Sequence, residues 1–299
     1  MLIKVEVDKN FRERMVYDNP LFPFQTCTDV FSRFIANTLN CHWHPEFEFG
    51  IVLKSEVEYY INDNHIHLKE GDGIFINSNT MHMATTTVQF RDAMMATIVF
   101  SPQFLSGNIS GPIYQKYIQP VVSNSDQAGF VLSPSRDWQR QIIQALLDAY
   151  ALDETSIGYE LKCSALIQDM WHTLVSHFSD AGINPAERGG DRRCEERVRA
   201  MLSFIHDHYS EDISIMDIAE AANVSRSECF RSFKKITNKK PVEYINEYRL
   251  AQAAALLLET NRAVSEISMD CGFSSSSYFG KLFREKTGMS PGSFRSPGA

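Results

Sequence analysis

The sequence lacks the features that mark membrane, secreted and zinc-finger proteins. Its 299 residues contain no apolar run near the roughly 18 residues that a membrane span needs. No N-terminal segment is first basic and then apolar, as a signal peptide would be. The six cysteines form no CxxC pair and no metal-finger spacing, so reduced structural thiols are expected. We therefore expect a cytoplasmic protein, with no membrane partner, whose length provides for two domains.

An excess of positive charge is also missing. The formal net charge of −8 would, taken alone, argue against a nucleic-acid partner. The charges are unevenly distributed, however. From Asp191 onward there are 16 basic and 15 acidic residues, whereas the first 190 residues hold 13 basic and 22 acidic ones. Because a DNA-binding face needs only local positive charge, the last third of the chain stays compatible with DNA.

The segment 214–240 has the pattern of two short helices separated by a tight turn. Apolar residues recur at helical spacing from Ile215 to Ala222, and Asn223-Val224 then interrupts the pattern. Ser225 is a residue type that caps the start of a second helix. From Arg226 on, this second helix and its end carry six basic residues and one acidic residue. Such a helix-turn-helix fits the major groove of DNA.

A second copy of this pattern follows about 50 residues later. The shift places Ser225 on Ser275 and Phe233 on Phe283. An internal repeat of this length is a strong structural signal. Between the copies, 241–259 is expected to be one long helix, since it contains no interior breaker. A rigid spacer would let both copies occupy successive major grooves, which are about 34 Å apart on one face of B-DNA.

These motifs, DIAxxANVSRSxxFRSFKK and CGFSSSSYFGKLFREKTGMSP, resemble the AraC/XylS family of transcriptional regulators over roughly 193–295. The resemblance implies a seven-helix domain that binds double-stranded DNA, and RNA polymerase as a partner if the protein activates transcription. The implied DNA-binding residues are Arg226, Ser227, Phe230, Arg231, Lys234, Ser276, Ser277, Tyr278, Lys281 and Arg284. Phe230 departs from the family, which often has a polar residue there; it can contact a thymine methyl group but cannot donate a hydrogen bond. The serines and Gly280 of the second copy suggest weaker base reading and more phosphate contacts.

From Phe31 to about Phe100 the sequence has the pattern of an all-β sandwich or barrel, in which short β-rich runs alternate with turn residues. The expected strands are Phe31–Leu39, Glu46–Leu53, Val57–Ile61, His65–Leu68, Gly73–Ile76 and Met94–Phe100. HWHPEFE at 42–48 and LKEGDGIFINSNTMH at 68–82 resemble the cupin jelly roll that forms the sensing half of many AraC-type regulators. Ser55 and Ser78 stand where enzymatic cupins usually have Gly and Pro, so the sensing type is the closer match.

Three interpretations compete for His42, His44, Glu48 and His82. Two histidines at i and i+2 share one face of a strand, and Glu48 shares it too. The matching positions of metallocupins hold a divalent metal, and three imidazoles with one carboxylate suit Zn, Fe or Mn. The resemblance to regulator-type cupins instead favours a ligand pocket that requires no cofactor. The third interpretation is structural histidines on a solvated strand.

The expected effector site is the mouth of the barrel. Its expected lining residues are His42, Trp43, His44, Glu46, Glu48, Tyr60 and His82. Aromatic rings stack on the CH faces of sugars, while carboxylates and imidazoles bind hydroxyl groups, so we expect a small sugar. Phe47, Phe49, Tyr59 and Phe75 are expected in the core instead.

Two amphipathic segments, 136–151 and 157–178, predict an αα-hairpin that either covers the barrel or pairs with a second subunit. The family resemblance favours a homodimer. The segment 179–192 has no apolar period and contains Gly-Gly, so we expect a linker there. The expected units are an effector-binding domain at 1–135, the hairpin at 136–178, the linker at 179–192, and the double helix-turn-helix domain at 193–299.

Together these patterns predict an α+β protein of two domains, a cupin-like β-barrel with a helical hairpin followed by an all-α domain with two helix-turn-helix motifs. The favoured function is a ligand-responsive transcriptional regulator that is not an enzyme, in which the effector changes the spacing or freedom of two DNA-binding domains. The alternative is a metal-dependent cupin enzyme, such as a sugar isomerase or dioxygenase, or a metal-containing sensor, fused to a DNA-binding domain.

Overall fold

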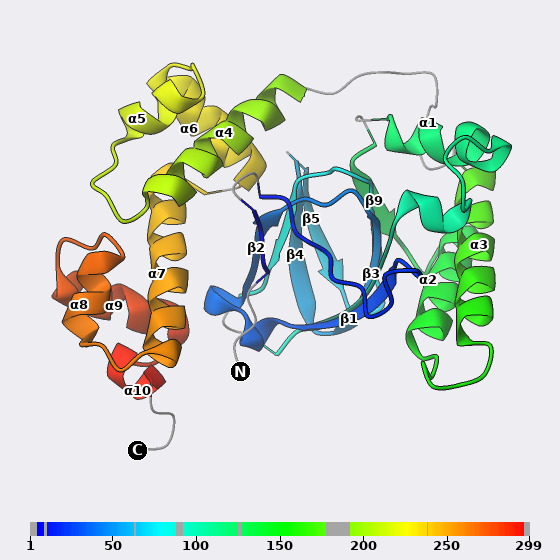
Figure 1. Cartoon of the computed structure of the whole chain (residues 1–299), viewed down its shortest axis with the longest axis horizontal. Helices are drawn as coiled ribbons and strands as arrows, with labels where there is room; N and C mark the ends of the chain where they lie inside the picture. Colours follow the sequence, from blue (N-terminus) through cyan, green and yellow to red (C-terminus); the bar gives the residue numbers. More distant parts are fainter. Residues whose placement is uncertain are drawn as a thin grey trace.

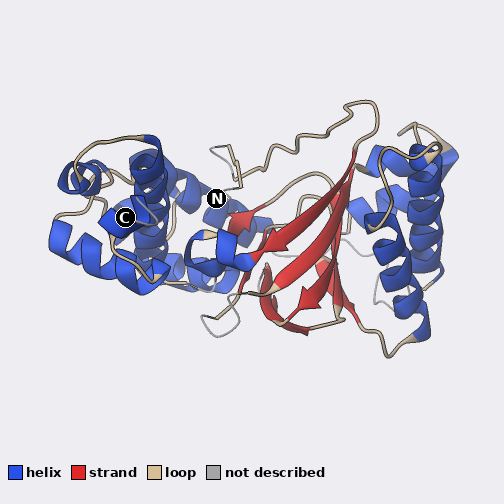
Figure 2. Ribbon diagram, turned by 90° about the horizontal axis from the view of Figure 1, so that it is seen from below, coloured by secondary structure: helices blue, strands red, loops and turns tan. Residues whose placement is uncertain are grey.

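The computed structural model describes residues 5–8, 11–62, 64–87, 92–124, 127–177, 192–237 and 239–295. Its β-structure lies in the middle of the molecule, with a helical hairpin on one side and a larger helical domain on the other (Figures 1 and 2). The expected α+β class with two domains is confirmed. Within the described ranges, no helix is both long enough and apolar enough to cross a membrane.

The described strands form two antiparallel sheets that do not close into one barrel, which is the sandwich form of the expected all-β domain. The first has the order β1 (Phe24–Val30), β8 (Met94–Phe100), β3 (Phe47–Lys54), β6 (Gly73–Ile76), β9 (Gly129–Leu132). The second has the order β2 (Thr38–His42), β7 (His82–Thr85), β4 (Glu56–Ile61), β5 (Asn64–Lys69). Side chains from both sheets meet in one apolar cluster that includes Val52, Val57, Ile61 and Ile74. The sheets therefore pack face to face, and alternate residues of each strand point inward.

Some strands differ from the expectation. The segment predicted as the strand Phe31–Leu39 begins with two single helical turns, η1 (Phe31–Arg33) and η2 (Ile35–Asn37), and the strand starts only at Thr38. Ala36 and Asn37 have positive φ angles of 56° and 51°, which interrupt an extended chain. Strand β9 was not among the expected strands. Its Gly129 fits against β6 so closely that a Cβ atom there would lie 2.4 Å from the carbonyl oxygen of Phe75.

The expected hairpin is formed by α2 (Asp137–Tyr150) and α3 (Tyr159–Ser176), which cover the outer face of the five-stranded sheet. Ile142 and Leu146 of α2 join Trp171 of α3 in a cluster with the aromatic residues of β3 and β6. The Trp171 ring lies 4.5 Å from that of Phe47. Between β8 and α2 come the short turns η4 (Pro102–Leu105), η5 (Tyr114–Ile118) and α1 (Gln119–Val122). Residues 179–191 of the expected linker lie outside the described residues.

The C-terminal domain has seven described helices: α4 (Arg192–His208), α5 (Ile215–Ala221), α6 (Arg226–Thr237), α7 (Pro241–Glu259), α8 (Val264–Asp270), α9 (Ser276–Thr287) and α10 (Pro291–Arg295). The expected caps are present. The Ser225 hydroxyl accepts from the Glu228 backbone N–H, and the Ser275 hydroxyl accepts from that of Tyr278. Phe233 and Phe283, the repeated aromatic residues, are both fully buried. The two copies therefore fold alike, on either side of the long helix α7.

The two domains pack against each other through a shared apolar cluster. Phe11, Met81 and Met83 of the N-terminal domain join residues of α4 and α6, among them Met201 and Phe233. Phe11 is fully buried, and its ring lies 4.1 Å from that of His206. Its φ angle of 63° is rare for a bulky residue. Burial of the ring against the helices compensates for this backbone conformation.

Polar contacts reinforce the same interface. The Arg199 guanidinium of α4 lies 4.3 Å from the centre of the Trp43 ring and donates a hydrogen bond of 3.1 Å to the Asn79 carbonyl oxygen. A second contact joins η2 to the other half of the helical domain, where Ile35 packs on the cluster around Leu250 and Phe279. The sandwich therefore touches both helix-turn-helix units.

We predict that Phe11→Ala loosens this domain contact. Truncating a buried Phe costs about 3–5 kcal/mol, and here the lost contacts lie between the domains. The melting temperature of the full chain should fall, and the radius of gyration measured by small-angle X-ray scattering should rise. Val16→Ala is the control, since that side chain is 74% exposed. Equal radii for both variants and the unmutated chain would show that Phe11 does not hold the domains together.

Candidate effector pocket and DNA-binding surface

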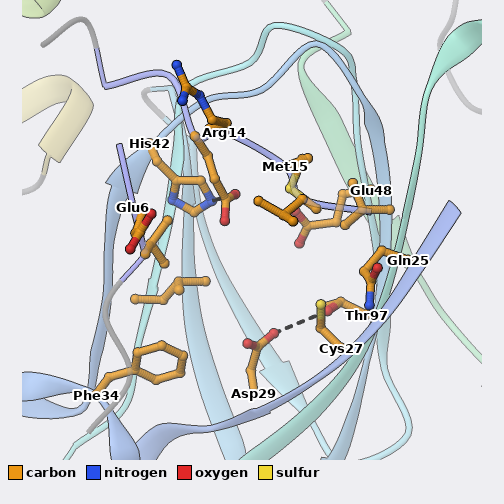
Figure 3. A pocket seen from close by; sticks show the side chains of 15 residues that line it. Glu6, Arg14, Met15, Gln25, Cys27, Asp29, Phe34, His42, Glu48 and Thr97 are labelled. Atoms are coloured by element: carbon orange, nitrogen blue, oxygen red, sulfur yellow. Dashed lines mark hydrogen bonds and ion pairs between the residues drawn. The ribbon is translucent and has the colours of Figure 1, made fainter. Parts of the chain in front are cut away.

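A cavity of about 340 Å³ lies between the two sheets, beneath the N-terminal segment (Figure 3). This volume falls in the range of small-molecule sites. The lining is mixed, with carboxylates and other polar groups beside apolar side chains: Val5, Glu6, Glu13, Arg14, Met15, Val16, Gln25, Cys27, Asp29, Phe34, Leu39, His42, Glu48, Thr97 and Val99. The cavity therefore offers both hydrogen-bonding groups and apolar contact.

The N-terminal segment forms one wall of this cavity. It is held by two backbone hydrogen bonds to Trp43, one from the Trp43 N–H to the Phe11 carbonyl and one from the Glu13 N–H to the Trp43 carbonyl. The Glu13 carboxylate points inward, with Oε2 3.5 Å from Nε2 of His42. Burial, together with the negative charge of Glu48, raises the pKa of Glu13 to about 7. The same short segment thus reaches into the cavity through Glu13 and into the domain interface through Phe11.

Three histidines and Glu48 form a buried cluster at the side of the cavity. Nδ1 of His42 lies 2.7 Å from the Asn40 carbonyl oxygen, and Nδ1 of His82 lies 2.9 Å from that of Thr80. Because a carbonyl can only accept, both Nδ1 atoms carry the proton and, in the neutral rings, both Nε2 atoms present lone pairs. One coordinating nitrogen from each of His42, His44 and His82 lies within 4.8 Å of the others.

Glu48 is the centre of this cluster. Its Oε2 lies 3.1 Å from Nε2 of His44 and 3.3 Å from Nε2 of His82, while its Oε1 accepts a 2.8 Å hydrogen bond from the Tyr59 hydroxyl. Burial opposes ionisation of Glu48, but the charges and hydrogen bonds of His82 and His44 outweigh it and hold its pKa well below the usual range. Burial is also the main reason that the pKa of His42 is well below its usual value, so His42 is neutral at pH 7.

The structure brings together five of the seven expected effector residues. His42 and Glu48 line the cavity, His44 and His82 lie directly behind Glu48, and Glu46 accepts a 2.9 Å hydrogen bond from the Tyr17 hydroxyl beside them. Trp43 and Tyr60 do not line this cavity. Trp43 faces the Arg199 guanidinium in the domain interface, and Tyr60 stacks on the exposed His65 at 4.6 Å.

Trp43 and Tyr60 point away from the cavity because successive side chains of an extended chain point to opposite faces. Trp43 lies between His42 and His44, which both point inward, and Tyr59, expected only in the core, takes the inward place beside Glu48. Sequence reasoning also missed Gln25, Cys27 and Asp29, which line the cavity from β1. Their i, i+2, i+4 spacing was the available signal, although no apolar period around them marked a strand.

Asp29 lies deep in the cavity (Figure 3). Its Oδ2 accepts a 3.2 Å hydrogen bond from the Thr97 hydroxyl. Burial raises the pKa of Asp29 from 3.8 to about 7, and repulsion by Glu48 adds to this. Burial likewise raises the pKa of the neighbouring Cys27 to about 12, so this thiol is protonated and unreactive at neutral pH.

The helical domain exposes most of the expected DNA-binding side chains. Arg226, Ser227, Arg231 and Lys234 are exposed on α6, and Ser276, Ser277, Tyr278, Lys281 and Arg284 are exposed on α9. Phe230 is half-buried, with the Arg226 guanidinium 6.0 Å from the centre of its ring. Arg231 forms an ion pair with Glu228, so DNA would have to compete with this carboxylate for the guanidinium.

Glu247 of α7 ties the two helix-turn-helix units together. It forms ion pairs with Lys239, which follows α6, and with Lys286 of α9, the latter at 2.7 Å. The side chain of Glu247 is only 15% exposed. Burial opposes its ionisation, but the two lysines outweigh this and lower its pKa. The spacer helix therefore fixes the relative placement of α6 and α9 through side chains as well as through its own stiffness.

We predict that Asp29→Asn stabilises the protein in a pH-dependent way. Because the pKa of Asp29 is higher in the folded state, the folded state binds more protons between about pH 4 and pH 7. The free energy of unfolding therefore falls as the pH rises through this window. Asn cannot ionise, so the variant avoids the cost of burying a charged carboxylate. It should be more stable than the unmutated chain by about 1–3 kcal/mol at pH 8, with allowance for solvent access through the cavity. Chemical denaturation at several pH values measures this difference in the free energy of unfolding.

The stability difference should shrink toward pH 5, and Asp169→Asn, at an exposed position of α3, should leave the curves unchanged. A constant difference between Asp29→Asn and the unmutated chain from pH 5 to pH 8 would contradict the assignment.

Comparison with known proteins gives matches over both domains. A helix-turn-helix domain model matches residues 218–296, and a cupin domain model matches residues 36–98. The uncharacterized HTH-type transcriptional regulator YdeC of Bacillus subtilis is 31% identical over 291 residues, which is 97% of each chain. The melibiose operon regulatory protein of Escherichia coli K12 is 27% identical over 257 residues, covering 85% of this chain and 82% of that protein.

A solved structure of an AraC-type transcriptional regulator from Chromobacterium violaceum is 31% identical, covers 33% of this chain and 89% of that one, and has a TM-score of 0.33. The full-length match to YdeC, together with the two domain models, shows the family. The chain belongs to the AraC family of transcriptional regulators and carries an N-terminal cupin-type domain and a C-terminal helix-turn-helix DNA-binding domain.

Proposed function

We propose that a small molecule bound in the cavity between the sheets controls DNA binding by the helical domain, and that the protein is not an enzyme. The observation that carries this proposal is the position of the N-terminal segment. Glu13 lies in the cavity 3.5 Å from His42, and Phe11, two residues away, lies in the domain interface 4.1 Å from His206.

A ligand that fills the cavity must move Glu13 or bind to it. Residues 11 and 13 are hydrogen-bonded to Trp43, and the Trp43 ring contacts Arg199 of α4. Movement of this segment therefore changes the contacts that dock the first helix-turn-helix on the sandwich. The ligand shifts the population of docked molecules by the difference between its affinities for the two states.

The effector class that we propose is a small polyhydroxylated molecule such as a sugar. The carboxylates of Glu13, Asp29 and Glu48 and the Nε2 atom of His42 can accept hydrogen bonds from its hydroxyl groups. The resemblance of the chain to a melibiose operon regulatory protein agrees with this class. Since Trp43 and Tyr60 do not line the cavity, apolar contact with the sugar comes from Phe34, Leu39 and Val99 instead.

We also propose that the protein is a cytoplasmic homodimer that pairs through the hairpin α2–α3. Leu161 of α3 is 79% exposed, and Ile157 before it is fully exposed. Such apolar side chains on a helical surface suit a subunit contact. RNA polymerase is the further partner if the protein activates transcription.

In the DNA-binding surface we propose that Arg231 reads a base and Lys234 contacts phosphate. Arg231→Ala should then cost about 1–3 kcal/mol of discrimination at one base pair, since a bidentate contact to guanine is lost. Lys234→Ala should weaken binding to all sequences alike and reduce the slope of log affinity against log salt by about one. Quantitative footprinting with single-base operator variants separates the two effects.

Lys54→Ala at the end of β3 is the control, because its side chain is 54% exposed and lies outside both the helical domain and the hairpin. If Arg231→Ala and Lys234→Ala behave alike, the two roles are wrongly assigned. If neither variant nor the full chain retains duplex DNA at low ionic strength, the proposed regulator function fails.

A second proposal is a divalent metal at His42, His44, His82 and Glu48, which would make the domain a metal-containing sensor. The donor set fits such an ion. When His82 is neutral, with Nδ1 protonated, its Nε2 and Oε2 of Glu48 are both acceptors 3.3 Å apart, and they repel each other unless a proton or a cation lies between them. No other described residue hydrogen-bonds to this buried Nε2. A cation between the two atoms relieves this repulsion. Hydrogen bonds from Nδ1 to backbone carbonyls, as His42 and His82 make here, commonly orient histidine ligands of metal ions.

We predict about one equivalent of metal in protein purified without chelator, measured by plasma mass spectrometry. His82→Gln and His44→Ala should lower this content at least tenfold, and a chelator should lower the melting temperature of the unmutated chain. His65→Ala, on the outer face of β5, should change neither quantity. Metal content well below one equivalent, with ligand binding unaffected by chelator, would eliminate both the metal sensor and the metal-dependent enzyme.

A further inference from the structure

The cavity presents hydrogen-bond acceptors almost without donors. Nε2 of His42 carries a lone pair, because Nδ1 donates to the Asn40 carbonyl. Oε1 of Gln25 is buried without a hydrogen-bond partner among the described residues. The carboxylates of Glu13, Asp29 and Glu48 add further acceptor positions. Next to Glu48, the fully buried Nε2 of His82 also has no partner in the described part of the chain.

The donors near these groups are already engaged. The Thr97 hydroxyl donates to Asp29, and the Tyr59 hydroxyl donates to Glu48. The Gln25 amide NH₂ donates to the Asp18 carboxylate and to the Thr26 carbonyl. A bound molecule therefore meets mostly acceptors below the rim, since Glu13 and Asp29 offer a donor only while they are protonated and only accept once they are ionised.

The charged groups that line the cavity are also mostly of one sign, which is negative. Among the described lining residues the only Lys or Arg is Arg14, whose exposed side chain lies at the rim, away from Asp29 (Figure 3). The other ionisable lining groups are the carboxylates of Glu6, Glu13, Asp29 and Glu48, the Cys27 thiol and the His42 imidazole, and none of them is a Lys or Arg cation. A buried carboxylate without a positive partner carries a large desolvation cost, which a cation of the right size removes.

We infer that the effector carries a protonated amine, which the cavity binds between Asp29 and Glu13. An ammonium group has three donors and no acceptor, so it complements this lining better than a hydroxyl group, which also needs a donor. This inference rests on the proposed function and narrows it, from polyhydroxylated molecules in general to those with a cationic nitrogen, such as amino sugars. Apolar carbons of the ligand contact Phe34, Leu39 and Val99.

Matched pairs of probes test the charge requirement. The affinity of the full chain for each probe is measured by thermal stabilisation and by titration calorimetry, with and without chelator. The pairs are glucosamine and glucose, galactosamine and galactose, and 1,4-diaminobutane and 1,4-butanediol. We expect at least one amine to bind tenfold or more tightly than its neutral partner, and Asp29→Asn to abolish this preference. Asp169→Asn should keep it.

Equal or tighter binding of the neutral partners overturns the inference but leaves a ligand-responsive regulator in place. Absence of binding by all three amines overturns it as well. Failure of the proposed function is recognised separately, by loss of DNA retention in the footprinting experiment. The preference for amines must also survive chelation, since a preference seen only with metal present would place the interaction at the histidine cluster and contradict binding at Asp29.

A tethered cation gives a test that needs no ligand. Val99 lines the cavity from β8, and Lys and Met at this position have similar length but differ in charge. A buried Lys usually destabilises a protein relative to Met. Here we expect Val99→Lys to melt at or above the temperature of Val99→Met, and the order to reverse when Asp29→Asn is added. A Val99→Lys variant that melts clearly below Val99→Met, with Asp29 intact, would overturn the inference.

Discussion

The pairing of the N-terminal segment with Trp43 is the contact on which the rest of this molecule depends. Two backbone hydrogen bonds hold residues 11–13 against the end of the strand that carries His42. They place the Glu13 carboxylate in the cavity and the Phe11 ring among the helices of the first DNA-binding unit. Because only one residue separates these two side chains, neither can move far without the other. The same short segment therefore belongs to both the cavity and the domain interface, so a movement at one is transmitted to the other.

The electrostatic character of the cavity follows from its location. Strand β1 supplies Gln25, Cys27 and Asp29 to the inner face of a sandwich, where desolvation raises the pKa of Asp29 and of the Cys27 thiol. Glu48 escapes this effect because two imidazoles and the Tyr59 hydroxyl surround its carboxylate. Two carboxylates in one cavity thus differ in their preferred charge. Glu48 stays ionised, whereas Asp29 gains most from a positive partner, which none of the described residues beside it provides.

The sequence predicted the features of the fold that depend on residues close together in the chain. Ser225 and Ser275 cap the recognition helices as their positions suggested, and the buried Phe233 and Phe283 follow from helical spacing. The cavity was harder to predict. Which of Tyr59 and Tyr60 points inward depends on the register of β4 against β7, which the spacing alone leaves open by one residue. The place of Glu13 depends on a tertiary contact with Trp43 that no periodicity records.

The helical domain shows why an acidic protein can carry two DNA readers. Acidic residues lie mostly in the sandwich and hairpin, while the exposed faces of α6 and α9 hold Arg226, Lys234 and Arg284. The helical domain has acidic residues too, and the largely buried Glu247 of α7 has a clear role among them: through its two lysine partners it fixes the ends of both readers. Their spacing is therefore set inside the domain. In the function proposed above, the effector changes whether the sandwich is docked against α4, α6 and α9, and hence how freely this preset pair of readers reaches DNA.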